Sequence, residues 1–292
     1  MILTFFIIVS LIALIIASYT DIKTLEVPDW LSYSLIAVGL GGNLIYSVYY
    51  SDPVFIIRSL LGFALALLIG VAMFYTGQWG GGDSKVLFGL GALLGFDYPL
   101  SLGFFAKFLV NMLFAGAIYG ILWIIAMYFK HSKAISKKAK SELKQKKLVK
   151  IRLFSGIAAI FFLIVVYFLP PVFIPQAKMT LVVLACFLYF MNYLFVFVRA
   201  VEKTAMIKLI LPEKLTEGDW IVDEIKINGK YIAGPKDLGI EKDKIKELLA
   251  LKKQGKINKV KVKYGIPFVP SFLIALIMTI VTDNILLFVF LK

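Results

Sequence analysis

The stretch "ILTFFIIVSLIALIIAS", Ile2–Ser18, decides the fold class, because it is an apolar run without a single charged side chain. Similar runs recur along the 292-residue chain, which is 60% hydrophobic and only 17% charged, with a mean hydropathy of +0.88. Soluble domains do not reach such values, and about 20 consecutive apolar residues form a helix that crosses a bilayer. The sequence therefore predicts a polytopic, all-α membrane protein.

About eight apolar segments are expected to form the membrane part. The fourth is short and rich in glycine, whereas most of the others approach the length of a spanning helix. The first has no basic region before it and has a long apolar run, so we interpret it as a retained span rather than a signal peptide. The segments are, in order, Ile2–Ser18, Trp30–Tyr50, Val54–Tyr75, Ser84–Phe96, Leu102–Phe129, Leu153–Ile174, Met179–Val198 and Pro267–Leu291.

Basic residues gather in two stretches and predict the orientation of the spans. Of the 32 Lys and Arg, 10 lie in Lys130–Arg152, interpreted as a solvated basic loop, and 16 lie in Arg199–Gly265. The positive-inside rule places both stretches in the cytoplasm, together with Tyr19–Asp29 and Thr76–Asp83, and leaves both termini outside. The net charge of +14 then reflects topology and attraction to anionic lipid, so no nucleic-acid partner is expected.

The polar stretch before the last apolar segment is expected to fold. "WIVDEIKINGKYIAG" alternates apolar positions around Asn228-Gly229, a hairpin signal. "EKDKIKELLALKKQG" places Ile245 and Leu248 on one helical face and ends at Gly255. These patterns predict a small cytoplasmic α+β domain inserted before the last helix. Because its stretch holds 16 basic and 10 acidic residues, we expect lipid contact or packing over a site, not attraction of a basic peptide.

The sequence predicts five parts and no metal centre. The single cysteine, Cys186, excludes a disulfide or a cysteine-rich zinc module within one chain, and the only histidine, His131, has no ligand cluster around it. The parts are a transmembrane core (1–129), a basic cytoplasmic loop (130–152), an additional transmembrane pair (153–198), the small α+β domain (199–266) and a C-terminal transmembrane helix (267–292).

Carboxylates near a membrane are costly and are therefore the best functional signal. Of the six that precede the basic loop, Asp21 and Asp83 lie at the ends of spans, on the expected cytoplasmic side, with no obvious partner nearby in sequence. The other four have ordinary explanations. Asp52 and Asp97 are expected in outer loops, Asp29 as a helix N-cap, and Glu26 as a solvated loop charge.

Asp83 follows three glycines in "GQWGGGDSKVLFGLGALLG", Gly77–Gly95. Capping of the fourth helix would explain Asp83 alone, but not the glycines, which permit positive φ and the close approach of another backbone. Two aspartates brought together share a proton, so that one can activate water while the other polarises a carbonyl. From the residues alone, a proteolytic dyad and the ion-coupling carboxylate pair of a transporter both remain open.

The lysine after Asp83 does not indicate a phosphate site. A P-loop requires lysine before the serine or threonine, and here Lys85 follows Ser84. We expect Lys85 to extend to the membrane interface, with support of an ionised Asp83 as the alternative.

Two motifs together resemble a known family. "GGGDSKVLFGLGALLG" resembles the Gly-x-Gly-Asp signature, and "TDIKTLEVPDW" resembles a companion motif in which an aspartate stands six residues before a Val/Ile-Pro pair. This pairing is similar to that of the type IV prepilin and preflagellin peptidases, which are aspartic proteases of the membrane. The resemblance implies that Asp21 and Asp83 are the catalytic pair, supported by the motif residues Gly80, Gly82 and Lys85, without metal or organic cofactor.

Departures from the family pattern indicate the archaeal branch. Bacterial members that also methylate the new N-terminus carry a tetracysteine zinc region, which one cysteine excludes. Compared with the compact six-span preflagellin enzymes, the chain has extra spans around Leu153–Val198, and its inserted domain looks like that of archaeal pilin-processing members. Pilin-like precursors are therefore favoured over flagellin precursors as partners. The resemblance implies a substrate with a short basic leader before an apolar helix, cleaved at the cytoplasmic face of the cell membrane. A cation- or proton-coupled transporter and a non-catalytic pilus assembly factor are the alternatives.

Overall fold

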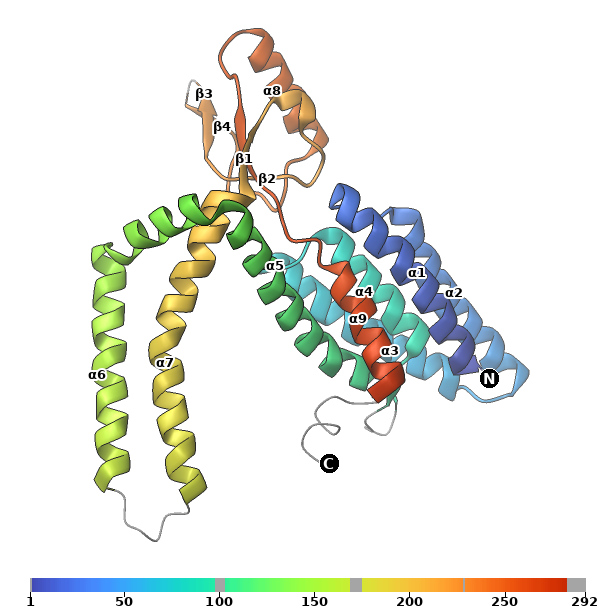
Figure 1. Cartoon of the computed structure of the whole chain (residues 1–292). Helices are drawn as coiled ribbons and strands as arrows, with labels where there is room; N and C mark the ends of the chain where they lie inside the picture. Colours follow the sequence, from blue (N-terminus) through green and yellow to red (C-terminus); the bar gives the residue numbers. More distant parts are fainter. Residues whose placement is uncertain (1, 98–102, 169–174, 228, 283–292) are drawn as a thin grey trace. The chain divides into compact units, whose positions relative to one another are not determined.

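The computed structural model describes residues 2–97, 103–168, 175–227 and 229–282, without the side chains of 175–177 (Figure 1). The chain divides into two compact units. The first, the core unit, comprises residues 1–123 together with 209–292, and the second, the hairpin unit, comprises residues 124–208. All site residues predicted from the sequence belong to the core unit.

Within the described residues, six helices are long and apolar enough to cross a membrane. The helices α4 (Gly81–Leu94) and α9 (Val269–Thr282) are shorter, so the prediction of about eight apolar segments is not confirmed as eight spans. The last predicted segment also continues beyond the described residues. The chain is a multi-pass membrane protein whose six long helices are α1 (Ile2–Thr24), α2 (Asp29–Tyr49), α3 (Val54–Tyr75), α5 (Phe104–Leu143), α6 (Lys146–Phe168) and α7 (Pro175–Val201).

The short helix α4 lies at the centre of the core unit, against α2 and α3, and most of its residues are buried. Small residues allow this packing: a Cβ on Gly91 would lie 2.4 Å from the carbonyl oxygen of Gly62, and one on Gly39 would lie 2.6 Å from the carbonyl carbon of Ala92. The hydroxyl of Ser59 also donates to the Ala92 carbonyl oxygen at 2.5 Å. Glycine spacing in α4 therefore serves close helix packing, which fixes the position of its N-terminus.

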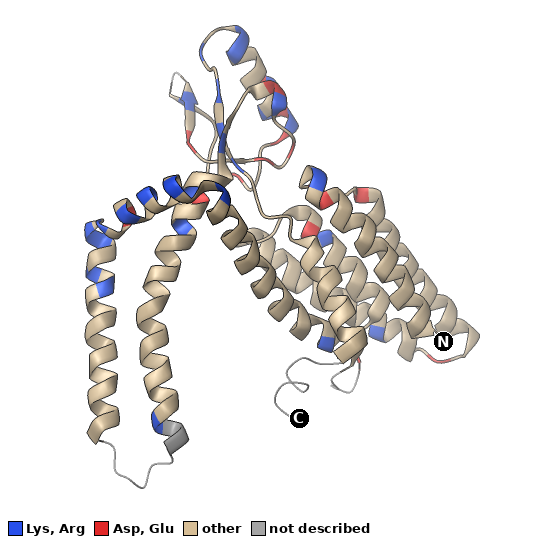
Figure 2. Ribbon diagram, viewed as in Figure 1, with Lys and Arg blue, Asp and Glu red and all other residues tan. Residues whose placement is uncertain are grey.

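The predicted basic loop is helical in the structure. The helix α5 continues beyond a kink at His131 as far as Leu143, and α6 begins at Lys146. Figure 2 shows Lys and Arg positions crowded along this stretch. Lysine is a good helix former, and its abundance here helps to explain why the segment folds as a helix although it is strongly charged.

One buried carboxylate holds this basic stretch to α7 within the hairpin unit. The Glu142 side chain is only 1% exposed and lies 2.8 Å from the Lys203 ammonium, 3.6 Å from that of Lys138 and 3.7 Å from the Arg199 guanidinium. Lys203 belongs to a π-helical turn, Glu202–Met206, that continues α7. Because an unpaired buried carboxylate is unstable, these cations explain its burial.

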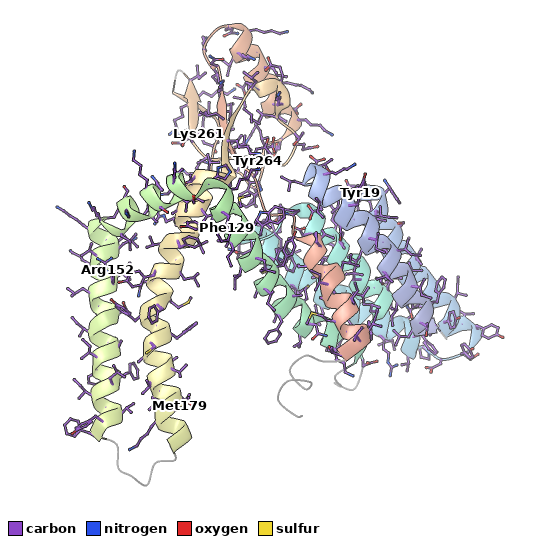
Figure 3. All side chains as sticks on the ribbon, viewed as in Figure 1. Tyr19, Phe129, Arg152, Met179, Lys261 and Tyr264 are labelled. Atoms are coloured by element: carbon purple, nitrogen blue, oxygen red, sulfur yellow. The ribbon has the colours of Figure 1, made fainter. Side chains whose placement is uncertain are left out.

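The helices α6 and α7 pack against each other and expose apolar side chains on their outer surfaces. The Asn192 amide donates to the Ser155 hydroxyl at 2.7 Å across the pair. None of the residues of α6 is buried, and on α7 the side chain of Met179, labelled in Figure 3, is exposed. Such surfaces suit contact with lipid rather than with water.

The strands and the helix predicted for the small α+β domain are present in the structure. The strands β1 (Ile207–Ile210), β5 (Val260–Lys263) and β2 (Trp220–Ile221) make one sheet in the order β1-β5-β2. A hairpin of β3 (Ile225–Ile227) and β4 (Lys230–Ala233) confirms the predicted pair of strands, although Asn228 of the turn lies outside the described residues. The helix α8 (Lys242–Lys253) buries Leu248 against both groups of strands, and Gly255 follows it at a φ of 71°. A short 3-10 turn, Pro212–Lys214, follows β1.

Candidate active site

Asp21 lies inside α1, not in the predicted loop at Tyr19–Asp29, because α1 continues to Thr24. Its side chain is buried, with the residue only 5% exposed. The backbone amide of Val269, the first residue of α9, donates to Asp21 Oδ2 at 3.0 Å. A helix N-terminus has amides without partners in the helix and a partial positive charge, so α9 is a suitable partner for this buried carboxylate.

Asp83 occupies the first turn of α4. Its Oδ2 accepts a hydrogen bond from the Gly80 backbone amide at 2.9 Å, so the helix-capping interpretation of this residue is correct in part. The next residue, Ser84, is buried and donates its hydroxyl to the Gly70 carbonyl oxygen of α3 at 2.9 Å. These two bonds fix the first turn of α4 and therefore the direction of the Asp83 side chain.

None of the three glycines before Asp83 has a positive φ, and only Gly82 makes a close approach to another segment. Gly80 has a φ of −72°, and Gly81 and Gly82 are the first residues of α4, so the expected left-handed backbone is absent from this triplet. At Gly82, a Cβ would lie 3.3 Å from both the Cβ and the backbone nitrogen of Val27. Gly82 thus lets the segment between α1 and α2 pass directly over the N-terminus of α4.

The fold brings Asp21 and Asp83 together. The two carboxylates are near enough for electrostatic repulsion between them, and Tyr119 of α5 is also within electrostatic range of Asp21. Each carboxylate faces the N-terminus of a different helix, α9 for Asp21 and α4 for Asp83. Neither the partner of Asp21 nor Tyr119 was identified from the sequence, because no local pattern indicates a contact between residues so far apart in the chain.

An aromatic cluster joins the segments that carry the two carboxylates. Trp79, immediately before Gly80, is 6% exposed, and its ring centroid lies 5.7 Å from that of Phe268 and 5.3 Å from that of Phe272. Phe268 directly precedes the amide that binds Asp21. Aromatic pairs at these separations contribute about 0.5–1.5 kcal/mol each beyond their buried area. The cluster therefore helps to set the distance between the two carboxylates.

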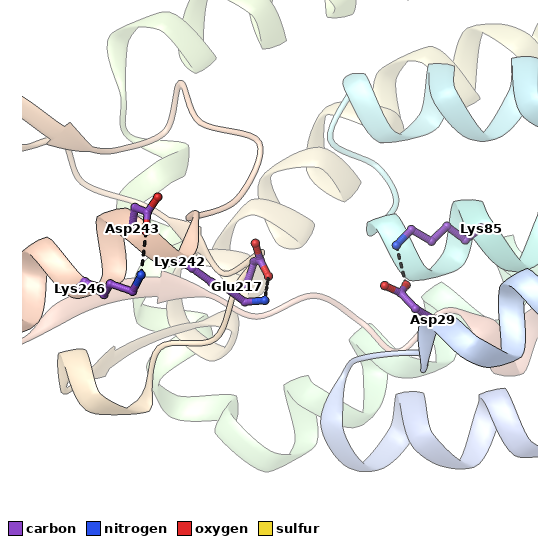
Figure 4. A network of polar contacts seen from close by, with 6 residues as sticks. All are labelled: Asp29, Lys85, Glu217, Lys242, Asp243 and Lys246. Carbon is purple, nitrogen blue, oxygen red and sulfur yellow. Dashed lines mark hydrogen bonds and ion pairs between the residues drawn. The ribbon is translucent and has the colours of Figure 1, made fainter.

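Lys85 interacts with neither aspartate of the pair. Its ammonium lies 2.6 Å from Asp29 Oδ1 (Figure 4) and 5.5 Å from the centre of the Tyr33 ring. Asp29 is the first residue of α2 and makes no side-chain cap, so its prediction as the N-cap is wrong; Pro28 occupies that position. The ion pair between Lys85 and Asp29 joins α4 to α2 beside the site. It also explains why Lys85 does not simply extend to the interface.

The arrangement has the elements of two-carboxylate acid–base chemistry. When two carboxylates come within a few Å of each other, the ionisation of both is costly, and such a pair can hold one proton between them. One oxygen of each side chain is fixed by a backbone amide, which orients both groups without a metal. Among the residues that the structure describes, no group of three or more His, Cys, Asp or Glu is placed to hold a metal ion.

The segment that contains both aspartates is similar to a known protein family. Residues 8–130 match the Type IV leader peptidase family, which confirms the resemblance predicted from the two motifs. A preflagellin peptidase of Methanocaldococcus jannaschii is 35% identical over 123 residues, covering 42% of this chain and 51% of the relative. One of Methanococcus voltae is 30% identical over 132 residues, covering 42% of this chain and 56% of the relative. One of Methanococcus maripaludis is 37% identical over 87 residues, covering 30% and 37%. The chain thus spans about half the length of the first two relatives.

Proposed function

Taking residues 8–130 as a type IV leader peptidase segment, we propose that this protein is a membrane aspartic endopeptidase. It removes the short leader of type IV pilin-like precursors at the cytoplasmic face of the membrane and does not methylate the new N-terminus. Asp21 and Asp83 are its catalytic residues.

One observation carries the proposal. Asp21 and Asp83 belong to separate helices and to separate motifs, yet their carboxylates are close enough to repel each other. The segment matched by the family includes both of them. A single capping aspartate would account for Asp83 but would give no reason for a second, buried carboxylate beside it.

The chemistry uses both carboxyl groups of the pair. The ionised one takes a proton from water while the water oxygen bonds to the carbonyl carbon of the leader junction. The protonated one gives its proton to the carbonyl oxygen, which would otherwise become an oxyanion. Collapse of the tetrahedral intermediate breaks the C–N bond, and a proton passes to the leaving amine. The leader departs with a new carboxylate, and the mature protein begins with a free amine.

The cytoplasmic orientation is inferred from charge. The basic stretches Lys130–Arg152 and Arg199–Gly265 are cytoplasmic by the positive-inside rule. The C-terminal ends of α1 and α3 are then on the cytoplasmic side as well. Single cysteines at Ser51 and at Lys253, in a Cys186→Ala background, test this. An impermeant thiol reagent on intact cells should label the first and not the second, and labelling of Lys253→Cys from outside would contradict the orientation.

Flagellin precursors are the alternative substrate. The three relatives named above are preflagellin peptidases, whereas the inserted α+β domain and the α6–α7 pair lie outside the segment that the family matches. Both substrate types share an apolar helix behind a polar leader, so the site chemistry alone does not separate them.

The direct test is cleavage by the purified protein in detergent or proteoliposomes. Pilin-like and flagellin precursors should be incubated side by side, and mass spectrometry should find the new N-terminus unmethylated. Preferential processing of the pilin-like precursor is expected, and preferential processing of flagellin would select the alternative substrate. No cleavage of either precursor, together with carboxylate-dependent uptake of a cation into proteoliposomes, would instead support a transporter.

A further inference from the structure

The α+β domain reaches the candidate site from one pair of strands. The strands β2 and β5 are antiparallel, and Trp220 on β2 lies opposite Lys263 on β5. From Lys263 the chain runs through a few residues to Val269, whose amide donates to Asp21 at 3.0 Å. The strand β5 of this pair is thus followed in the chain by the amide that binds the Asp21 carboxylate.

The strand β2 leads to the second carboxylate through a side-chain contact. Gly77 has a φ of 70°, and a Cβ there would lie 2.8 Å from Cη2 and 3.0 Å from Cζ3 of Trp220. Both the backbone conformation and the indole ring therefore require glycine at this position. Gly77 begins the loop Gly77–Gly80, which ends at the amide bonded to Asp83.

Two further observations concern the same region. Asp219, next to Trp220, is within range of electrostatic repulsion from Glu26 in the segment between α1 and α2, without a contact between the two. Inside the loop, Trp79 packs on Phe268, which belongs to the connection between β5 and α9. The loop Gly77–Gly80 thus contacts Trp220 of the domain at Gly77, and Phe268 of the segment that follows β5 at Trp79.

We propose that Trp220 is a positioning residue, through which the α+β domain holds the loop Gly77–Gly80 and thereby the separation of Asp21 and Asp83. This inference rests on the proposed function and adds to it that the inserted domain controls turnover. Trp220 acts on the site through Gly77, not by contact with the reacting atoms. With the domain in place, Asp21 and Asp83 have the separation that catalysis needs. Without the indole ring, the loop Gly77–Gly80 moves and the two carboxylates separate.

The expected consequence is a loss in turnover rather than in substrate binding. A displacement of reacting groups by about 1 Å can lower the rate by about 100-fold even when its cause lies away from the chemistry. Because Trp220 holds the loop and not the substrate, its removal should lower kcat and leave KM almost unchanged. Phenylalanine retains part of the aromatic contact and should restore part of kcat.

The test compares Trp220→Ala and Trp220→Phe with Trp30→Ala, a matched control on the exposed surface of α2. Cleavage of a pilin-like precursor gives kcat and KM for each protein in detergent. Hydrogen–deuterium exchange of peptides covering Thr76–Gly80 reports on the loop without any need for activity. Exchange in α8 shows whether the α+β domain is still folded.

For Trp220→Ala we expect a fall in kcat of about tenfold or more, a KM within about twofold, faster exchange in Thr76–Gly80 and unchanged exchange in α8. Trp220→Phe should lie between, and Trp30→Ala should match the wild type. Unchanged kcat and loop exchange would overturn the inference, and so would a raised KM with unchanged kcat, which would make Trp220 a docking residue. If α8 also unfolds in Trp220→Ala, the inference is judged on Trp220→Phe, again by kcat, KM and the exchange of Thr76–Gly80. If wild type cleaves no precursor, the proposed function fails, whereas loop exchange still tests the contact.

Discussion

Gly82→Ala is expected to lower activity without lowering stability. The added Cβ would lie 3.3 Å from the Cβ and backbone nitrogen of Val27 and 3.4 Å from its Cγ2, so Val27 must move by a few tenths of an ångström. Val27 belongs to the segment that joins α1, which carries Asp21, to α2. The substitution therefore pushes the support of one carboxylate away from the helix turn that carries the other.

The magnitude follows from this displacement. If about 1 Å of misplacement costs about 100-fold in rate, a shift of a few tenths should cost roughly two- to tenfold. The free energy of unfolding should stay the same or rise, because alanine is more favourable than glycine in a helix by up to about 1 kcal/mol. Gly81→Ala is the matched control, since the nearest atom to its Cβ would be Phe74 Cε2 at an ordinary 3.9 Å.

The assay is precursor cleavage at saturating substrate, together with thermal unfolding of each variant in the same detergent. Gly82→Ala should lose activity while Gly81→Ala keeps it, with both proteins at least as stable as the wild type. Equal activity of the two variants, whether high or low, would refute the role given to the contact with Val27. Gly82→Val should be more impaired than Gly82→Ala, because it is larger and branched at Cβ.

Three further predictions concern packing, the ion pair and the domain. Gly91→Ala places a Cβ 2.4 Å from a backbone oxygen of α3 and should lower stability by about 1–3 kcal/mol in thermal unfolding, whereas Gly41→Ala, with open space around it, should not. Lys85→Met removes an ion pair in which Asp29 is 62% exposed, so it should cost no more than about 1 kcal/mol and leave cleavage almost unchanged; abolished cleavage would mean that Lys85 acts on the carboxylate pair. Burial raises the pKa of the Asp237 carboxyl, but hydrogen bonds from ammonium, hydroxyl and amide groups outweigh burial and lower this pKa. The ionised carboxylate therefore stabilises the folded domain fully above a pH of about 4, and this stabilisation is lost as the pH falls through the lowered pKa. Asp237→Asn should therefore reduce the urea midpoint of the α+β domain at pH 7, followed by Trp220 fluorescence with the other tryptophans replaced, and differ little from wild type near pH 2.

The sequence was sufficient for the class of membrane protein and for selecting two carboxylates that the fold brings near each other, Asp21 and Asp83; their catalytic role stays a prediction. Long uncharged runs predict membrane helices because lipid offers no partner for backbone polar groups. Asp21 and Asp83 could be selected because a carboxylate at the end of an apolar helix needs a reason to be there. The alternating strands and the face of α8 in the inserted domain are local patterns, and the structure has both.

The partners of these residues could not be predicted, because they depend on contacts between distant parts of the chain. Nothing near Asp21 in sequence indicates the amide of Val269, and nothing near Lys85 indicates Asp29. The glycines before Asp83 were interpreted as permitting positive φ and the close approach of another backbone; Gly82 makes such an approach, whereas the positive φ occurs at Gly77, next to Trp220.

The basic stretch was interpreted as a loop because charge was weighed above helix propensity. Its many lysines favour a helix, and Glu142 stabilises that helix by pairing with cations on α5, at the end of α7 and in the π-helical turn that continues α7. A single acidic residue among many lysines gave no signal in the sequence that it would be buried.

The central claim is that Asp21 and Asp83 act as one catalytic pair, and the most direct measurement is precursor cleavage by Asp21→Asn and Asp83→Asn. Asparagine keeps the size of the side chain and an oxygen that can accept a hydrogen bond from the Gly80 or Val269 amide, but it removes the ionisable carboxyl proton. Each variant should fold and lose about 10²–10⁴-fold in kcat, since general acid–base catalysis contributes that much, while Asp52→Asn, as the control, keeps its activity. Normal processing by a folded Asp83→Asn or Asp21→Asn protein would contradict the account.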